Sequence, residues 1–86
     1  MKPKFSTNPN FIIQKIEGKT SIFDAEKSVL YTLNDEAAVI FRGFQLQWTK
    51  ERIVKEIIIK YNIKEETATL DVDELIEVMA RKKILI

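Results

Sequence analysis

Hydrophobic and polar residues follow two different spacings along the chain, one in its first third and another in the rest. The first part holds three short runs rich in β-branched and aromatic residues, at positions 11–17, 20–23 and 28–33. Such runs between turn residues are typical of strands. The pair Gly18-Lys19 predicts the first turn, with Gly18 at a positive φ, and residues 24–27 predict the second. Strands so close in sequence pair most simply with their neighbours, so an antiparallel meander is expected.

The second spacing is that of amphipathic helices, with apolar residues three and four positions apart. Asn34 is a suitable N-cap for a first helix, and Gly43 is expected to help end that helix. Thr49 caps a second helix, and Asn62 ends it. A third helix is expected to begin between positions 66 and 71. Its predicted core stripe consists of Val72, Leu75, Ile76 and Met79.

Three strands followed by three helices predict an α+β fold. The second and third helices, separated by a short break, resemble a helix-turn-helix pair, and the strands would supply a wing. We therefore expect one winged helix-turn-helix domain over residues 1–86. Residues 1–10 contain both prolines and are expected to form an extended N-terminal arm. Residues 84–86 predict either a short closing strand or a docked tail.

Composition removes several classes of chemistry. The 86 residues include no cysteine and no histidine, which excludes disulfides, thiolate metal sites and histidine-based triads. Carboxylates such as Asp24 and Glu26 are present, but no spacing singles out an acid/base pair. We therefore expect a protein that is not an enzyme, with no catalytic residue, no metal and no cofactor.

Charge and hydropathy limit the classes of binding partner. The chain has 14 Lys and Arg against 13 Asp and Glu, a net charge of +1, so nothing draws it electrostatically toward nucleic acid or a membrane. The longest apolar run, residues 37–41, is too short to cross a bilayer, and the first residues lack the apolar run of a signal peptide. A cytoplasmic location is expected, with no nucleic-acid or membrane partner.

From position 23 onward the residues form a recognisable pattern. Its elements are Phe23-Asp24, Tyr31-Thr32-Leu33-Asn34 opening a helix, Trp48-Thr49, Ile53-Val54, Tyr61, Asp71-Val72, Leu75 and Ile84-Leu85-Ile86. In order, spacing and total length, residues 9–86 resemble the PqqD-like proteins. These include protein D of pyrroloquinoline quinone biosynthesis and the recognition domains of lasso-peptide pathways. Such sequences often carry Gly where Ser28 and Lys83 stand here, which affects local turn geometry.

The resemblance implies a non-catalytic peptide chaperone. It would bind the leader segment of a ribosomally made precursor peptide by strand addition, against the third strand and beside the third helix. It would then present the precursor to a modifying enzyme, such as a radical SAM enzyme or a leader protease and cyclase. We expect a monomer in function. The candidate peptide-binding residues are Ser28, Val29, Leu30, Tyr31, Thr32, Leu33, Asp71, Glu74, Leu75, Val78 and Lys82.

Several of these residues also have a purely structural interpretation. The side chains of Tyr31 and Leu33 share one face of a strand, and we expect them in the core even if their backbone binds peptide. Trp48 is likewise expected in the core. Val78 lies about 110° from the centre of the apolar stripe, so it either widens the core or lines an exposed groove.

DNA binding is the alternative function that a winged helix-turn-helix allows. The second helix of such a motif enters the major groove. Here that helix carries Asp71, Asp73, Glu74 and Glu77 in its early turns. These carboxylates would face the phosphates, where affinity depends on Lys and Arg. The charges therefore favour peptide binding over DNA binding.

Overall fold

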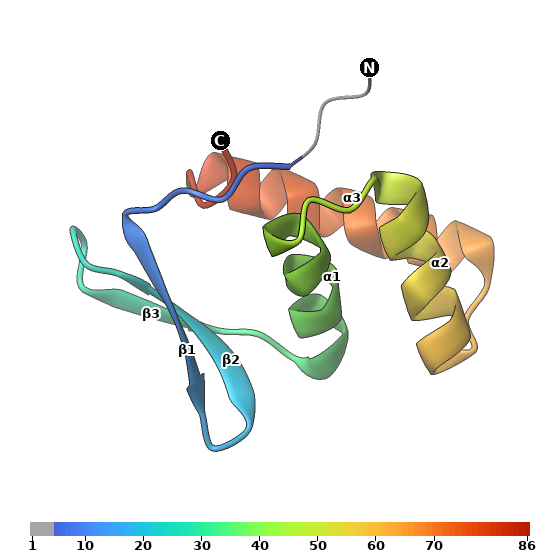
Figure 1. The fold of residues 1–86 in the computed structure, drawn as a ribbon, viewed down its shortest axis with the longest axis horizontal. Helices are drawn as coiled ribbons and strands as arrows, with labels where there is room; N and C mark the ends of the chain where they lie inside the picture. Colours follow the sequence, from blue (N-terminus) through green and yellow to red (C-terminus); the bar gives the residue numbers. More distant parts are fainter. Residues whose placement is uncertain (1–4) are drawn as a thin grey trace.

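The computed structural model describes residues 5–86 and contains the predicted succession of three strands and three helices (Figure 1). Residues 1–4 of the expected N-terminal arm lie outside the described residues. The predicted α+β fold is confirmed, and the strand ends differ from the predicted ones by one residue. The elements are β1 (Phe11–Ile16), β2 (Lys19–Asp24), β3 (Val29–Thr32), α1 (Asp35–Gln45), α2 (Lys50–Tyr61) and α3 (Glu65–Arg81).

The three strands form an antiparallel sheet in the order β1-β2-β3. Glu17 and Gly18 connect the first two strands with φ values of 52° and 80°, the positive values of a tight type I′ hairpin turn. Asp24 shapes the second turn, because its carboxylate accepts hydrogen bonds from the backbone N–H groups of Glu26 and Lys27. Both predicted turns are present, and β3 ends up at one edge of the sheet.

Local signals set the starts of α1 and α2 as expected. The Asn34 side chain accepts a hydrogen bond from the Ala37 N–H at 2.8 Å, and the Thr49 hydroxyl accepts one from the Arg52 N–H at 3.2 Å. The predicted start of α3 is wrong, because this helix begins earlier, at Glu65. Its N-cap, Lys64, makes no side-chain capping bond, so the sequence offers no N-cap signal there.

The prediction that Gly43 helps to end α1 is also wrong. The left-handed residue is Gln47, at a φ of 60°, and the Trp48 N–H bonds back to the Gly43 carbonyl at 2.9 Å, as in a Schellman motif. Gly43 itself is helical and buried. A Cβ at Gly43 would lie 2.6 Å from Cγ1 of Ile53, so the glycine allows α1 to pack closely on α2.

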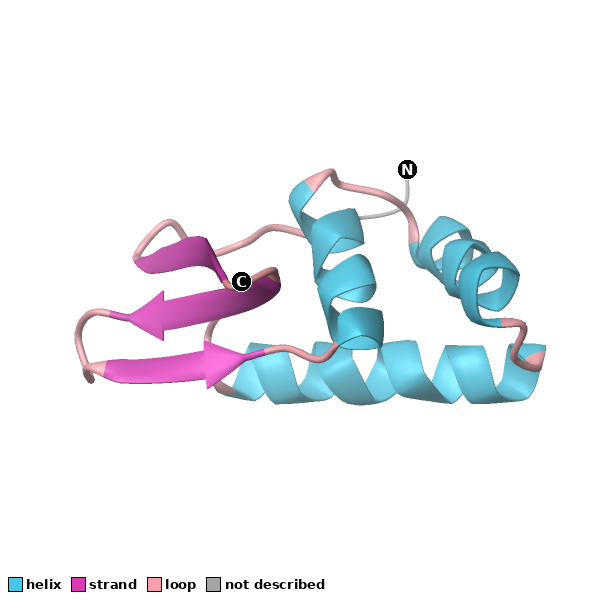
Figure 2. Cartoon of the chain, turned by 90° about the horizontal axis from the view of Figure 1, so that it is seen from below, coloured by secondary structure: helices cyan, strands magenta, loops and turns pink. Residues whose placement is uncertain are grey.

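The core lies between the three helices and reaches the sheet through Ile22 of β2. α3 runs along one side of α1 and α2, and the sheet stands at one end of the molecule (Figure 2). Trp48 is partly buried against this core, as predicted. The largest fully buried side chains are those of Ile22, Ile40, Phe41, Phe44, Ile53, Ile57, Val72, Met79 and Ile84.

The C-terminal residues fold back onto the N-terminal arm. Lys83, at a φ of 64°, ends α3 in a second Schellman motif, in which the Ile84 N–H bonds to the Met79 carbonyl at 2.9 Å. Thr7 and Leu85 then form an antiparallel bridge. The predicted closing segment is therefore a single bridge to the arm. Among the helices of residues 5–86, none has the length and apolar character needed to cross a membrane.

Candidate functional site

β3 presents an unpaired backbone edge. Within residues 5–86 this strand pairs with β2 alone. The Leu33 N–H donates to the Thr20 carbonyl at 2.9 Å, and bonded and non-bonded positions alternate along an antiparallel pair. The N–H and C=O groups of Leu30 and Thr32 therefore point away from β2. These are the groups with which a further strand would pair.

The backbones of β3 and α3 stay apart, and the region between them, which side chains enter, is called the gap hereafter. No Cα atom of β3 lies within 8 Å of a Cα atom of α3, although the C-terminal end of α3 lies near the sheet (Figures 1 and 2). One side-chain contact crosses the gap, in which the Lys82 ammonium lies 4.7 Å from the centre of the Tyr31 ring. This is within the range of a cation–π interaction. The structure thus brings the predicted strand and helix residues into one region.

A groove of about 320 Å³ lies between the start of α1 and the middle of α3. It brings together four of the predicted residues from α3, and Val78, which is 38% exposed, lines it instead of widening the core. The α1 side of the groove was not predicted from the sequence, because an acidic residue such as Glu36 in the first turn of a helix is explained by the helix dipole alone. The lining residues are Asn34, Glu36, Ala37, Ile40, Asp71, Glu74, Leu75 and Val78.

The groove carries negative charge. Glu36 and Asp71 face each other across it, and burial together with the hydrogen bond and charge of Asp71 raises the pKa of Glu36 to about 7. A raised pKa is expected where two carboxyls share one site. Glu74 is a third carboxylate in the lining. The groove therefore combines acidic groups with the apolar side chains of Leu75 and Val78.

The remaining predicted residues do not line the groove: Lys82 is the C-cap of α3, and the others lie in β3 or next to it. Ser28 precedes the strand in a turn, at a φ of 54°. Val29 and Leu30 are 37% and 49% exposed. Tyr31 and Leu33 are partly buried against the core, which confirms the structural interpretation of their side chains. The strand therefore offers a backbone edge with two exposed aliphatic side chains.

No group of three or more acidic, histidine or cysteine side chains in residues 5–86 is arranged to hold a metal ion.

The sequence matches the family of Coenzyme PQQ synthesis protein D (PqqD) over residues 19–85. No curated protein matches the sequence. A solved structure described as lasso peptide synthetase B1 complexed with the leader peptide aligns with a TM-score of 0.90 at 15% identity, covering 98% of this chain and 99% of that chain. Another, TbiB1 in complex with the TbiA(beta) leader peptide, aligns with a TM-score of 0.84 at 16% identity, covering 93% of each chain. At these identities the likeness establishes the fold.

Proposed function

The chain belongs to the Coenzyme PQQ synthesis protein D (PqqD) family, and on that premise we propose that it binds the leader segment of a precursor peptide as an added strand. The observation that carries the proposal is the unpaired edge of β3, where the backbone N–H and C=O groups of Leu30 and Thr32 point away from β2. In strand addition the backbone bonds supply affinity, and pockets for alternate side chains supply selectivity.

The groove is suited to the selective part of this recognition. It lies where the gap between β3 and α3 meets α1, and Leu75 and Val78 provide apolar contacts within it. An extended peptide sends successive side chains to opposite faces, so alternate leader residues would enter the groove. Ser28, which precedes β3, and Lys82, which contacts the Tyr31 ring, complete the proposed peptide-binding set.

The comparisons support this proposal. The two solved structures reported above are described as complexes with a leader peptide. Their sequence identities are low, so the transfer to this chain rests on its own open edge and groove.

The chain is proposed to act without catalysing a reaction itself. It lacks histidine and cysteine, and the carboxylates of the groove border a gap suited to a peptide strand. A separate enzyme, such as a radical SAM enzyme or a leader protease and cyclase, would modify the presented precursor. We propose a monomer, because a dimer formed through β3 would occupy the peptide edge, and a cytoplasmic location, where the precursor is made.

DNA binding is the weaker alternative. The face of α3 that borders the groove carries Asp71 and Glu74, and Glu36 lies opposite. A phosphate backbone would be repelled from this face. A gel shift with duplex DNA at low salt should therefore show no complex, and a salt-dependent complex would favour the alternative.

The test is an amide NMR titration of isotope-labelled protein with synthetic leader peptides taken from short precursors encoded beside its gene. The proposal expects micromolar or tighter affinity. Chemical-shift changes should concentrate in residues 28–33 and 71–82. Shifts confined to other surfaces, or no binding by any of these peptides, would contradict it.

A further inference from the structure

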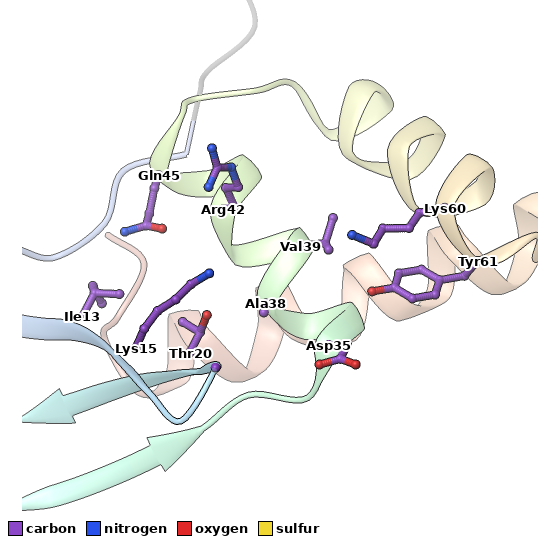
Figure 3. A pocket seen from close by; sticks show the side chains of 11 residues that line it. Ile13, Lys15, Thr20, Asp35, Ala38, Val39, Arg42, Gln45, Lys60 and Tyr61 are labelled. Atoms are coloured by element: carbon purple, nitrogen blue, oxygen red, sulfur yellow. The ribbon is translucent and has the colours of Figure 1, made fainter.

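A second hollow lies on the opposite side of α1 from the groove. It measures about 570 Å³ and is bordered by the β1–β2 hairpin, α1 and the end of α2 (Figure 3). Asp35 and Arg42 line the hollow, whereas Ala37 and Ile40 line the groove. At about 100° per helical residue these two pairs face nearly opposite directions. The hollow and the groove can therefore be occupied at the same time.

Three cations surround the hollow. They are Lys15 from β1, Arg42 from α1 and Lys60 from α2. Within residues 5–86 none of the three forms an ion pair or a side-chain hydrogen bond. Asp35 is the one carboxylate among the described residues that line the hollow. Three positive groups and one negative group leave an excess of two positive charges on a chain whose net charge is +1.

Neutral groups complete the lining. The Tyr61 hydroxyl is buried and has no hydrogen-bond partner within residues 5–86. Burial, followed by the charges of Asp35 and Glu36, raises the pKa of Tyr61, so its O–H remains a donor at neutral pH. Ile13 from β1 and Val39 from α1 provide apolar surface in the hollow. The hollow thus offers cations at its rim and an apolar floor.

We propose that this hollow is a docking site for an acidic segment of a second protein. Carboxylate side chains would pair with Lys15, Arg42 and Lys60, and the aliphatic parts of the same segment would cover the floor. A small inorganic anion would satisfy the cations and leave the apolar surface uncovered. If the proposed function holds, the second protein is the enzyme that acts on the bound precursor; the acidic docking site itself does not depend on that function.

The test is an NMR titration of the labelled full chain with a blocked hexaglutamate peptide, a blocked hexaglutamine peptide and inorganic phosphate. Hexaglutamate should shift the amides around Lys15, Arg42 and Lys60 in a saturable manner. Its affinity should fall several-fold between low salt and about 0.15 M salt, because exposed charges are screened over about 8 Å at that ionic strength. Hexaglutamine should produce no such shifts.

Substitutions make the test specific. The double variant Lys15→Gln, Arg42→Gln should weaken hexaglutamate binding at least tenfold. Lys27→Gln, which removes an exposed lysine in the turn before β3, should leave it unchanged. Equal losses in both variants, or shifts spread over the whole surface, would show nonspecific attraction and overturn the proposal. If phosphate shifts the same amides and binds with the same affinity as hexaglutamate, the hollow is a site for a small anion and the docking proposal is overturned.

The separate titration with leader peptides distinguishes this proposal from the proposed function. Leader peptides report on residues 28–33 and 71–82, and hexaglutamate reports on the opposite side of α1. If hexaglutamate binds and no leader peptide binds, the peptide-recognition function alone is contradicted. The reverse result would contradict the docking site alone.

Discussion

The Lys82 ammonium lies 4.7 Å from the centre of the Tyr31 ring and joins the end of α3 to the edge strand β3. Elsewhere the two elements keep their Cα atoms more than 8 Å apart. A peptide that adds to β3 would run through the gap that this pair spans. The contact can therefore stabilise the free protein, and it also lies on the proposed path of the peptide.

The first prediction concerns the contribution of the Tyr31–Lys82 contact to the free energy of unfolding. An exposed cation–π contact contributes about 0.5–1 kcal/mol. A double-mutant cycle of Tyr31→Leu and Lys82→Met, followed by urea denaturation, should give a coupling free energy of that size. Tyr31→Phe should retain the coupling, because the ring remains. Additive effects of the two single substitutions would mean that the contact adds nothing to folding.

Glu36 predicts a pH dependence of stability. Burial, together with Asp71, raises the pKa of Glu36 from 4.5 to about 7 in the folded chain. A raised pKa means that the folded state holds the proton more tightly than the unfolded chain does. Its contribution is therefore fully present below about pH 4.5 and is lost as pH rises through about 7.

The substitution Glu36→Gln should remove this dependence. Relative to the unmodified chain, the variant should gain stability between pH 5 and pH 8. The gain should not exceed about 1 kcal/mol, because the carboxyl is partly exposed to solvent. Urea denaturation at both pH values measures the difference. Asp71→Asn should reduce the dependence without abolishing it, because burial remains the largest cause. An equal effect of Glu36→Gln at both pH values would contradict the shared carboxyl site.

Lys83 provides a prediction about backbone strain. It occupies the left-handed position of the Schellman motif at the end of α3, with a φ of 64°, where glycine is preferred. Lys83→Gly should raise the free energy of unfolding by up to about 1 kcal/mol. Glycine avoids the energetic cost of the left-handed conformation, and this gain is partly offset by the larger backbone entropy that glycine loses on folding. Ala80→Gly, at an exposed helical position, should lower it by about 0.5–1 kcal/mol. Thermal unfolding of both variants checks the opposite signs.

The sequence contained the local determinants of the fold. Caps at Asn34 and Thr49 and the turn at Gly18 act through neighbours two or three residues away, so each could be located without coordinates. The start of α3 could not, because Lys64 gives no capping signal and Ala68, in the first turns, is held by burial in the core. Helix propensity is a weak guide where tertiary packing decides.

The candidate site was predictable to the same extent. The family resemblance and helix periodicity brought β3 and the exposed face of α3 together as one region. Glu36 was not predicted as a site residue because its partner Asp71 is distant in the sequence. An acidic residue at a helix start is also explained by the helix dipole alone. Contacts between side chains of different helices depend on how α1 packs against α3, and this packing cannot be read from the residues next to each position in the sequence.

Gly43 illustrates the same limit and provides a further prediction. A glycine near a helix end resembles a terminator, yet its lack of a side chain is required by Ile53 on α2. Gly43→Ala should destabilise the chain by about 1–3 kcal/mol through overpacking, as measured by chemical denaturation. The additional substitution Ile53→Val should recover part of the loss, because Cδ1 of Ile53 would lie 2.9 Å from the new methyl group. A neutral Gly43→Ala would mean that the two helices can separate freely.

The last prediction tests the open edge directly. The Leu30 N–H points away from β2, so Leu30→Pro removes a donor that the sheet does not use, and proline is tolerated at such edge positions. The variant should keep its melting temperature within a few degrees. It should bind leader peptide at least tenfold more weakly, because one backbone bond is lost and the ring obstructs the added strand.

Two further variants separate the backbone from the side chain. Leu30→Ala keeps the N–H and should weaken binding about threefold or less, since only part of an exposed side chain is removed. Tyr31→Pro removes a bond to β2 and should unfold the sheet, which circular dichroism would detect. If Leu30→Pro folds and binds leader peptide as tightly as the unmodified chain, the peptide does not pair with this edge, and the groove of α1 and α3 alone would have to hold it.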